Sequence, residues 1–246
     1  MKSKYPESEG FIKEFLGAEE FINNKKRYCL WLVNASPAEL RKIPPIMERI
    51  ENVRKLRSES KRAATQKLAY TPTLFGEIRQ PERGQFLIVP RVSSERRRYL
   101  PIGFLNAETI ASDASLIVPN ASLYHFGVLT SNVHMAWMRA VAGRLKSDYR
   151  YSASIVYNNF PWPNPTEAQR AKIEQTAQAI LDARAKFPDC SLADLYDEAA
   201  MPPELRQAHQ ENDRAVMQAY GFPVKSTFME SECVAELFRM YQGMVK

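Results

Sequence analysis

Two oppositely charged residues that stand two positions apart, Lys146 and Asp148, have the side chains needed to read one base pair. A lysine ammonium donates hydrogen bonds to the acceptors of guanine, and an aspartate carboxylate accepts one from the amino group of cytosine. In an extended segment this spacing puts both side chains on one face. The pair is therefore predicted to read both halves of a G·C pair, with a surface ion pair as the alternative.

A second charged group, RVSSERRR at residues 91–98, follows directly on an apolar segment that ends in Pro90. Four arginines and two serines in eight residues supply bidentate and hydroxyl donors for phosphate oxygens. The alternative is a solvated basic loop, the commoner fate of a charge run. We predict DNA backbone contacts from this run and from one arginine beside the first group: Arg91, Ser93, Ser94, Arg96, Arg97, Arg98 and Arg150.

Signatures of catalysis do not accompany these groups. The nine glycines include no GxG, so the sequence lacks the glycine-rich turn that brings S-adenosylmethionine or a dinucleotide close to the backbone. The three histidines have no metal-ligand spacing, and the three cysteines form no CxxC. We therefore predict no catalytic, cofactor-binding or metal-binding residue in this chain.

The segment NNFPWP, residues 158–163, is a poor match to the Asn-Pro-Pro-aromatic loop that holds a flipped base, because Phe160 separates the polar residue from the prolines. We interpret it as a turn between domains, with Phe160 and Trp162 as buried anchors. Three prolines at positions 161–165 cannot continue a helix or a central strand. They predict a division into residues 1–160 and 161–246.

The balance of basic and acidic residues also changes at this proline-rich segment. Residues 1–165 hold 25 lysines and arginines against 15 acidic residues, whereas residues 166–246 hold 9 against 13. A polyanionic partner is therefore plausible for the first part only. The sequence has no apolar run of the roughly 20 residues needed to cross a bilayer, and its N-terminus has no apolar signal-peptide core. These features predict a cytoplasmic protein without a membrane partner.

The helices and strands that must position these groups are predicted from the spacing of apolar residues and from the capping and turn residues that bound each segment. Short apolar segments bounded by Pro, Gly, Asn or Asp predict strands at residues 85–89, 99–104, 115–118, 123–129 and 153–157. Helical spacing and caps predict helices that begin after Ser36, cover 46–68 and 132–145, and then occupy most of the chain from Thr166 onward, ending near 188, 221 and 241. The predicted fold class is α+β: a mixed helix and strand DNA-recognition domain followed by a small helical C-terminal subdomain.

Several strings of residues resemble the target-recognition region of the MmeI-like, adenine-specific DNA methyltransferases, many of which are also type IIL restriction endonucleases. The similarity runs from about Phe15 to about Tyr241 and includes a C-terminal helical segment at residues 166–222. Its most specific strings are FLGAEEFINNKKRYCLWL, TPTLFGEIRQP, PRVSSERRRYLPIGF, SLYHFGVLTSNVHMAWMR and GRLKSDYRYSASIVYNNFPWP.

The resemblance implies a recognition module for double-stranded DNA, with the nuclease and methyltransferase domains upstream in a longer parent protein. S-adenosylmethionine is then expected for the parent and not for this chain, and the upstream methyltransferase domain is an expected partner. In the family, variation at the positions matching Lys146 and Asp148 accompanies one recognised base pair, and the position matching Ala114 is associated with another. Ala114 offers no hydrogen bond, so it is expected to leave a base pair loosely read.

Two other functions remain as alternatives at this stage. One is a self-sufficient S-adenosylmethionine-dependent DNA methyltransferase, against which the missing cofactor loop argues. The other is a protein-interaction or regulatory module whose basic face binds an acidic partner. Binding of S-adenosylmethionine would support the first, and DNA binding without a steep salt dependence would support the second.

Overall fold

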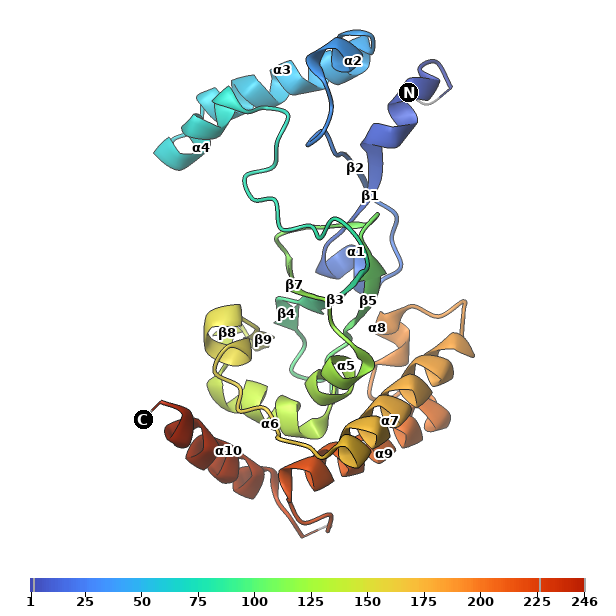
Figure 1. Ribbon diagram of the computed structural model, residues 1–246, viewed down its shortest axis with the longest axis vertical. Helices are drawn as coiled ribbons and strands as arrows, with labels where there is room; N and C mark the ends of the chain where they lie inside the picture. Colours follow the sequence, from blue (N-terminus) through green and yellow to red (C-terminus); the bar gives the residue numbers. More distant parts are fainter. Residues whose placement is uncertain (2, 226, 246) are drawn as a thin grey trace.

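The strand at the centre of the molecule is β3 (Gln85–Pro90), which pairs with the antiparallel neighbours β5 (Gly103–Asn106) and β7 (Ser115–Pro119). The computed structural model (Figure 1) describes residues 1, 3–225 and 227–245. Residues 86–90 of β3 are all buried, which explains their continuous apolar run. The strands predicted at 85–89 and 115–118 are confirmed. The strand predicted at 99–104 begins only at Gly103, because Pro101 has no N–H to donate to a neighbour.

Two smaller sheets flank this one. The strands β1 (Ile12–Leu16), β2 (Tyr28–Leu30) and β6 (Ile110–Ala111) form one sheet in the order β2-β1-β6. The strands β4 (Val92–Ser93), β8 (Gly143–Leu145) and β9 (Asp148–Arg150) form the other in the order β4-β9-β8. None of these six strands was predicted from the sequence; they are two to five residues long, at or below the usual strand length.

The N-terminal part forms a lobe of helices around a small core of its own. It contains η1 (Pro6–Phe11), α2 (Pro37–Arg41), α3 (Pro44–Ser58), α4 (Ala63–Lys67) and η2 (Leu68–Tyr70). The short helix α1 (Ala18–Ile22) lies outside this lobe, beside the central sheet (Figure 1). The predicted helix start after Ser36 is confirmed, since the Ser36 hydroxyl accepts the main-chain N–H of Glu39. The single helix predicted over 46–68 is wrong. Ser58 and Ser60 hydrogen-bond main-chain groups near the break, and such bonds compete with helix continuation.

Two predicted strands are helical. Residues 123–129 form α5 (Leu123–Leu129), and residues 153–157 form the π-helical turn η3 (Ala153–Tyr157). A short apolar run fits a buried helix as well as a strand, and serines at 122 and 152 cap these two helices. The helix α6 (Asn132–Val141) is shorter than predicted, because the chain turns extended at Ala142 and enters β8.

A single hydrophobic core joins the residues on either side of Pro161. The helices α7 (Glu167–Ala185), α8 (Leu192–Leu195), α9 (Pro203–Tyr220) and α10 (Glu230–Met244) follow the proline-rich turn. In Figure 1, α7 and α9 lie side by side and α10 lies beside α6. Phe160 is fully buried and Trp162 is partly buried against it. The α+β fold class with its helical C-terminal part is thus confirmed, and the helical part shares its core with the preceding residues.

Candidate nucleic-acid interface

The sheet β4-β9-β8 brings together the two charged groups that the sequence singles out. In its register Val92 lies opposite Arg150 and Ser93 opposite Tyr149. The main-chain N–H of Tyr151 also donates to the carbonyl oxygen of Arg91 (2.8 Å). The arginine run and the β8–β9 hairpin therefore form one continuous surface, although about 50 residues separate them in the sequence.

The loop that carries Ala114 is part of the same surface. The main-chain N–H of Arg91 donates to the carbonyl oxygen of Ala114 (3.2 Å), and the guanidinium Nε of Arg91 donates to that of Asp113 (2.7 Å). Ala114 is exposed. On its other side lies Gly17, where a Cβ would come within 2.6 Å of Ser112 Oγ and 3.3 Å of the Cβ of Ala114. The loop is thus fixed between Arg91 and the start of α1.

Lys146 and Asp148 have different positions from those predicted for an extended segment. Lys146 and Ser147 form the two-residue turn of the β8–β9 hairpin, and Leu145 pairs with Asp148 across it. The backbone of Lys146 has a φ of 56°, in the left-handed region that residues other than glycine seldom adopt. The prediction that both side chains share a strand face is therefore wrong, because one residue belongs to the turn. Lys146 is exposed and Asp148 is half-buried.

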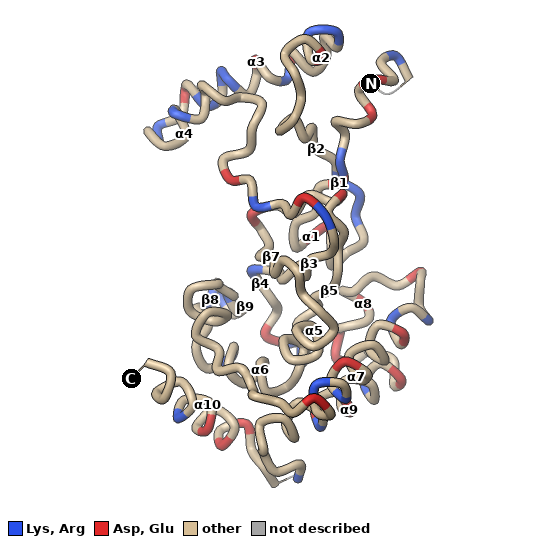
Figure 2. The backbone as a smooth tube through the Cα atoms, viewed as in Figure 1, with Lys and Arg blue, Asp and Glu red and all other residues tan. Residues whose placement is uncertain are grey.

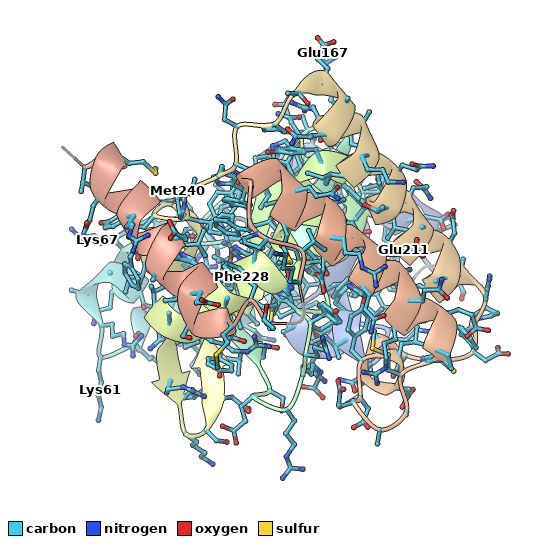
Figure 3. The ribbon with its side chains drawn as sticks, turned by 90° about the horizontal axis from the view of Figure 1, so that it is seen from below. Lys61, Lys67, Glu167, Glu211, Phe228 and Met240 are labelled. Atoms are coloured by element: carbon cyan, nitrogen blue, oxygen red, sulfur yellow. The ribbon has the colours of Figure 1, made fainter. Side chains whose placement is uncertain are left out.

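An arginine that the sequence analysis did not select stabilises this turn. The guanidinium of Arg144 donates to the carbonyl oxygen of Ser147 (2.6 Å) and stacks on the ring of Tyr149, with 3.8 Å between the guanidinium carbon and the ring centroid. It also forms an ion pair with Glu95 (3.5 Å). Among the described residues the hairpin turn carries no ion pair between Lys146 and Asp148, so the alternative of a surface ion pair is not observed. In Figure 3 the hairpin, in yellow, extends away from the helices.

The predicted backbone-contact residues differ in how accessible they are. Arg96 and Arg150 are exposed, and Ser94 is half-buried, with its hydroxyl accepting the main-chain N–H of Arg96 (3.3 Å). Ser93 is only 1% exposed, and its hydroxyl has no hydrogen-bond partner in the described part of the chain. A buried hydroxyl cannot reach a phosphate, so Ser93 does not belong to this surface.

Two of the arginines are drawn toward acidic residues of the chain itself. Burial lowers the pKa of Arg97, and the carboxylates of Asp148 and Asp197 oppose that shift. The phenol of Tyr99 and the carboxylate of Asp213 raise the pKa of Arg98. Arg98 is nevertheless exposed, and together with Arg96 and Arg97 it lines a polar pocket that also contains Glu198.

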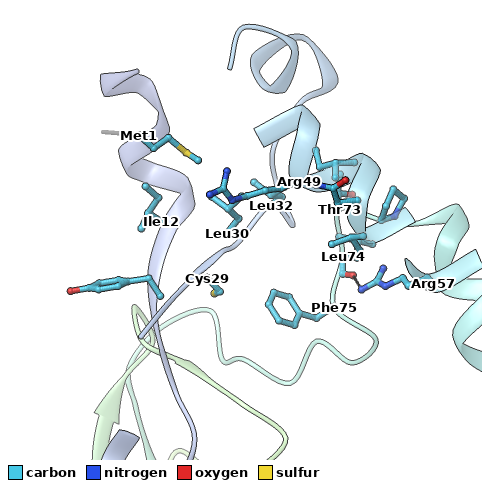
Figure 4. Close-up of a pocket in the computed structure, with 15 residues that line it drawn as sticks. Met1, Ile12, Cys29, Leu30, Leu32, Arg49, Arg57, Thr73, Leu74 and Phe75 are labelled. Carbon is cyan, nitrogen blue, oxygen red and sulfur yellow. Dashed lines mark hydrogen bonds between the residues drawn. The ribbon is translucent and has the colours of Figure 1, made fainter. Parts of the chain in front are cut away.

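No metal site accompanies this surface in the residues that the structure describes. They contain no group of three or more His, Cys, Asp and Glu side chains placed to hold a metal ion. A cavity of about 650 Å³ lies between β2 and α3 (Figure 4), and its charged lining residues are Arg49 and Arg57. Within the same described residues, no helix has the length and apolar character needed to span a membrane.

An exposed two-stranded ribbon with Lys, Arg and Asp near its turn, beside a loop held by an arginine, is similar to the β-ribbon class of DNA-recognition modules, since the major groove of duplex DNA admits such a ribbon. Family models agree with this class. Residues 1–164 match the target recognition domain of MmeI, and residues 165–246 match the MmeI C-terminal domain. The chain belongs to this family and consists of its target recognition domain followed by its C-terminal domain.

Two known proteins are similar over nearly the whole chain. DNA methyltransferase A of Bacillus subtilis (strain 168) is 40% identical over 244 residues, which are 99% of this chain and 27% of that protein. The solved structure of the type IIL restriction–modification enzyme MmeI in complex with DNA is 45% identical and superimposes with a TM-score of 0.95. The match covers 99% of this chain and 32% of MmeI. The chain thus spans about a third or less of the length of these relatives.

Proposed function

We propose that this chain binds a specific duplex DNA sequence and positions an adenine for a methyltransferase domain of a longer protein. One observation carries the proposal: strand pairing and hydrogen bonds join the segments around residues 91 and 114 to the β8–β9 hairpin, whose turn contains Lys146. The similarity to MmeI, solved in complex with DNA, supports the same function. Binding of S-adenosylmethionine belongs in this proposal to the methyltransferase domain, and the site of action is the cytoplasm.

The hairpin turn and the 112–114 loop are the proposed base-reading elements. Lys146 projects from the turn and donates to guanine, while Asp148 accepts from the paired cytosine. Ala114 presents only a methyl group, so the base pair that it faces is read loosely. Asp148 is half-buried, and its carboxylate lies near enough to Arg97 to act on that guanidinium.

The proposed backbone contacts come from the rim of the same surface. Arg96 and Arg150 are exposed there, and Arg144 adds a third guanidinium beside the turn. Arg91, Ser94 and Arg97 contribute from half-buried positions. These contacts fix the register of the protein on the duplex, whereas the hairpin and the loop supply the sequence preference.

Salt dependence of duplex binding tests this proposal directly. With about three phosphates neutralised by the hairpin surface, log affinity falls with log salt with a slope of about −2.7 or steeper. Titration of the chain with S-adenosylmethionine provides the companion measurement, because cofactor binding to this chain would support a self-sufficient methyltransferase instead. Duplex binding that is absent, or insensitive to salt, would contradict the proposal.

A further inference from the structure

The helices α3 and α4 form an arm that extends beyond the core of the N-terminal lobe. That core consists of Leu32, Leu40, Ile43, Ile46 and Ile50. Only the first two turns of α3 contribute to it, through Ile46 and Ile50, and α4 buries no residue at all among those described. Figure 1 shows the rest of α3, with α4, projecting away from the central sheet. Hydrophobic burial therefore explains the base of this arm but not its outer half.

The outer half of the arm is nevertheless built as an ordered structure. The guanidinium of Arg57 donates to the carbonyl oxygens of Leu68 (3.0 Å), Thr71 (3.0 Å) and Leu74 (2.8 Å). These bonds tie the returning chain to α3, and Figure 4 shows Arg57 directed at Leu74. An arginine that satisfies three carbonyl oxygens fixes the arm in one geometry.

The surface of the arm is strongly basic. Residues 44–70 contain seven lysines and arginines against three glutamates, a net charge of +4. Five of the cations are exposed and have no ion pair in the described part of the chain. Arg49 lies in the first two turns of α3, and the other four lie on the outer half of the arm: Lys55, Lys61, Arg62 and Lys67. Figure 2 shows the blue positions along both helices, and in Figure 3 the labelled Lys61 and Lys67 lie at the outer edge of the molecule.

Two large side chains stand among these cations without burial. Tyr70 is 90% exposed and Leu56 is 73% exposed. Tyr70 lines an open groove together with Arg54, Lys55 and Lys67. An exposed tyrosine beside several cations combines a hydroxyl donor and an apolar ring with charges that attract phosphate.

We infer that the α3–α4 arm is a second DNA contact, which binds the phosphate backbone of the duplex outside the base pairs read by the hairpin. The inference rests on the proposed DNA recognition. The arm projects on the same side of the molecule as the β8–β9 hairpin (Figure 1), so one duplex can follow both. The 15 residues of α3 extend for about 22 Å, which matches roughly six base pairs of the duplex. Contacts to phosphates alone make this site independent of sequence.

The test replaces the four unpaired cations on the outer half of the arm by glutamine in the full chain: Lys55→Gln, Lys61→Gln, Arg62→Gln and Lys67→Gln. The matched control makes the same charge change on the helical part: Lys172→Gln, Lys186→Gln, Arg214→Gln and Arg239→Gln, all at exposed positions. Affinity is measured by fluorescence anisotropy between 50 and 200 mM salt, with a duplex limited to the recognition site and with one extended on both flanks. Circular dichroism checks that both variants remain folded.

For the extended duplex, the arm variant is expected to reduce the steepness of the log affinity against log salt plot by about 3.6, since each of the four lost phosphate contacts removes about 0.9. The ratio of affinities for specific and nonspecific sequence stays unchanged, and so does binding to the short duplex. The control variant changes neither quantity. An arm variant with the wild-type salt slope on the extended duplex would overturn the inference.

These outcomes are separable from failure of the proposed function. If the wild-type chain and the control bind no duplex, DNA recognition itself is refuted. If the wild-type chain binds the short duplex with sequence preference and the arm variant binds the long one equally well, only the arm contact is refuted. An arm variant that instead loses thermal stability in a longer protein containing this chain would assign the arm to a contact with another domain and would also overturn the inference.

Discussion

Replacing His134 by glutamine should remove much of the acid sensitivity of this protein. His134 is fully buried in α6, its Nε2 lies 2.9 Å from the hydroxyl of Tyr151, and its Nδ1 has no partner among the described residues. Burial lowers the pKa of His134 to about 3 from 6.5. The folded state therefore binds fewer protons than the unfolded state below pH 6.5, and stability is lost as the pH falls.

The size of this loss follows from the two pKa values. Between pH 7.5 and pH 5, protonation of His134 in the unfolded state costs the folded protein about 2 kcal/mol. His209 is also fully buried with a lowered pKa, and it adds a loss in the same direction. Asp213 acts in the opposite direction, because burial raises its pKa to about 6 and the folded state gains a proton there, which stabilises it by about 1.4 kcal/mol at pH 5.

Urea denaturation at pH 7.5 and pH 5 isolates the contribution of His134. The change in unfolding free energy between the two pH values should be smaller by about 2 kcal/mol in His134→Gln than in the wild type, and any constant effect of the substitution cancels. A matched control, His125→Gln, lies at a half-buried position and should keep most of the wild-type pH dependence. Equal pH dependence in His134→Gln and wild type would refute the assignment of a neutral, buried His134.

Two further substitutions test the contacts that hold the recognition surface in place. Asp213→Ala leaves the buried hydroxyl of Tyr99 and the main-chain N–H of Asn132 without an acceptor. The substitution should lower the unfolding free energy, measured by urea denaturation, by about 2–5 kcal/mol. A loss below about 0.5 kcal/mol would contradict this role of Asp213. Gly17→Val should displace the loop that carries Ala114 while the protein stays folded. Footprinting of the bound duplex should then show altered protection at one base pair. Unchanged protection would show that Gly17 does not control the position of this loop.

The elements that could be predicted from the sequence are those set by local capping residues or by one continuous apolar run. The caps at Ser36 and Thr166 and the apolar run of β3 are visible in the residues because one short segment determines each of them. Residues 123–129 are different. Their apolar run suits a strand or a buried helix, and only packing against α7 decides in favour of the helix.

The candidate site shows the same limit. Sequence chemistry selected the arginine run and the Lys146–Asp148 pair, but their adjacency depends on the long-range pairing of β4 with β9. The turn at Lys146 was not predictable, because neither Lys146 nor Ser147 is a residue that favours a positive φ. Ser93 was assigned to the surface from its residue type, whereas the pleat of β4 buries it.

The base preference of a charge-swapped hairpin is the strongest test of whether Lys146 and Asp148 read a G·C pair. Lys146→Glu and Asp148→Arg are introduced together, and duplexes are selected from a randomised library by the chain and by any longer methyltransferase that contains it. We expect the preference to change from G·C to C·G at one position of the selected site, with about 1–3 kcal/mol of discrimination between the two base pairs. The preferences at the other positions should be retained. An unchanged preference at every position would contradict the reading of that base pair by this hairpin.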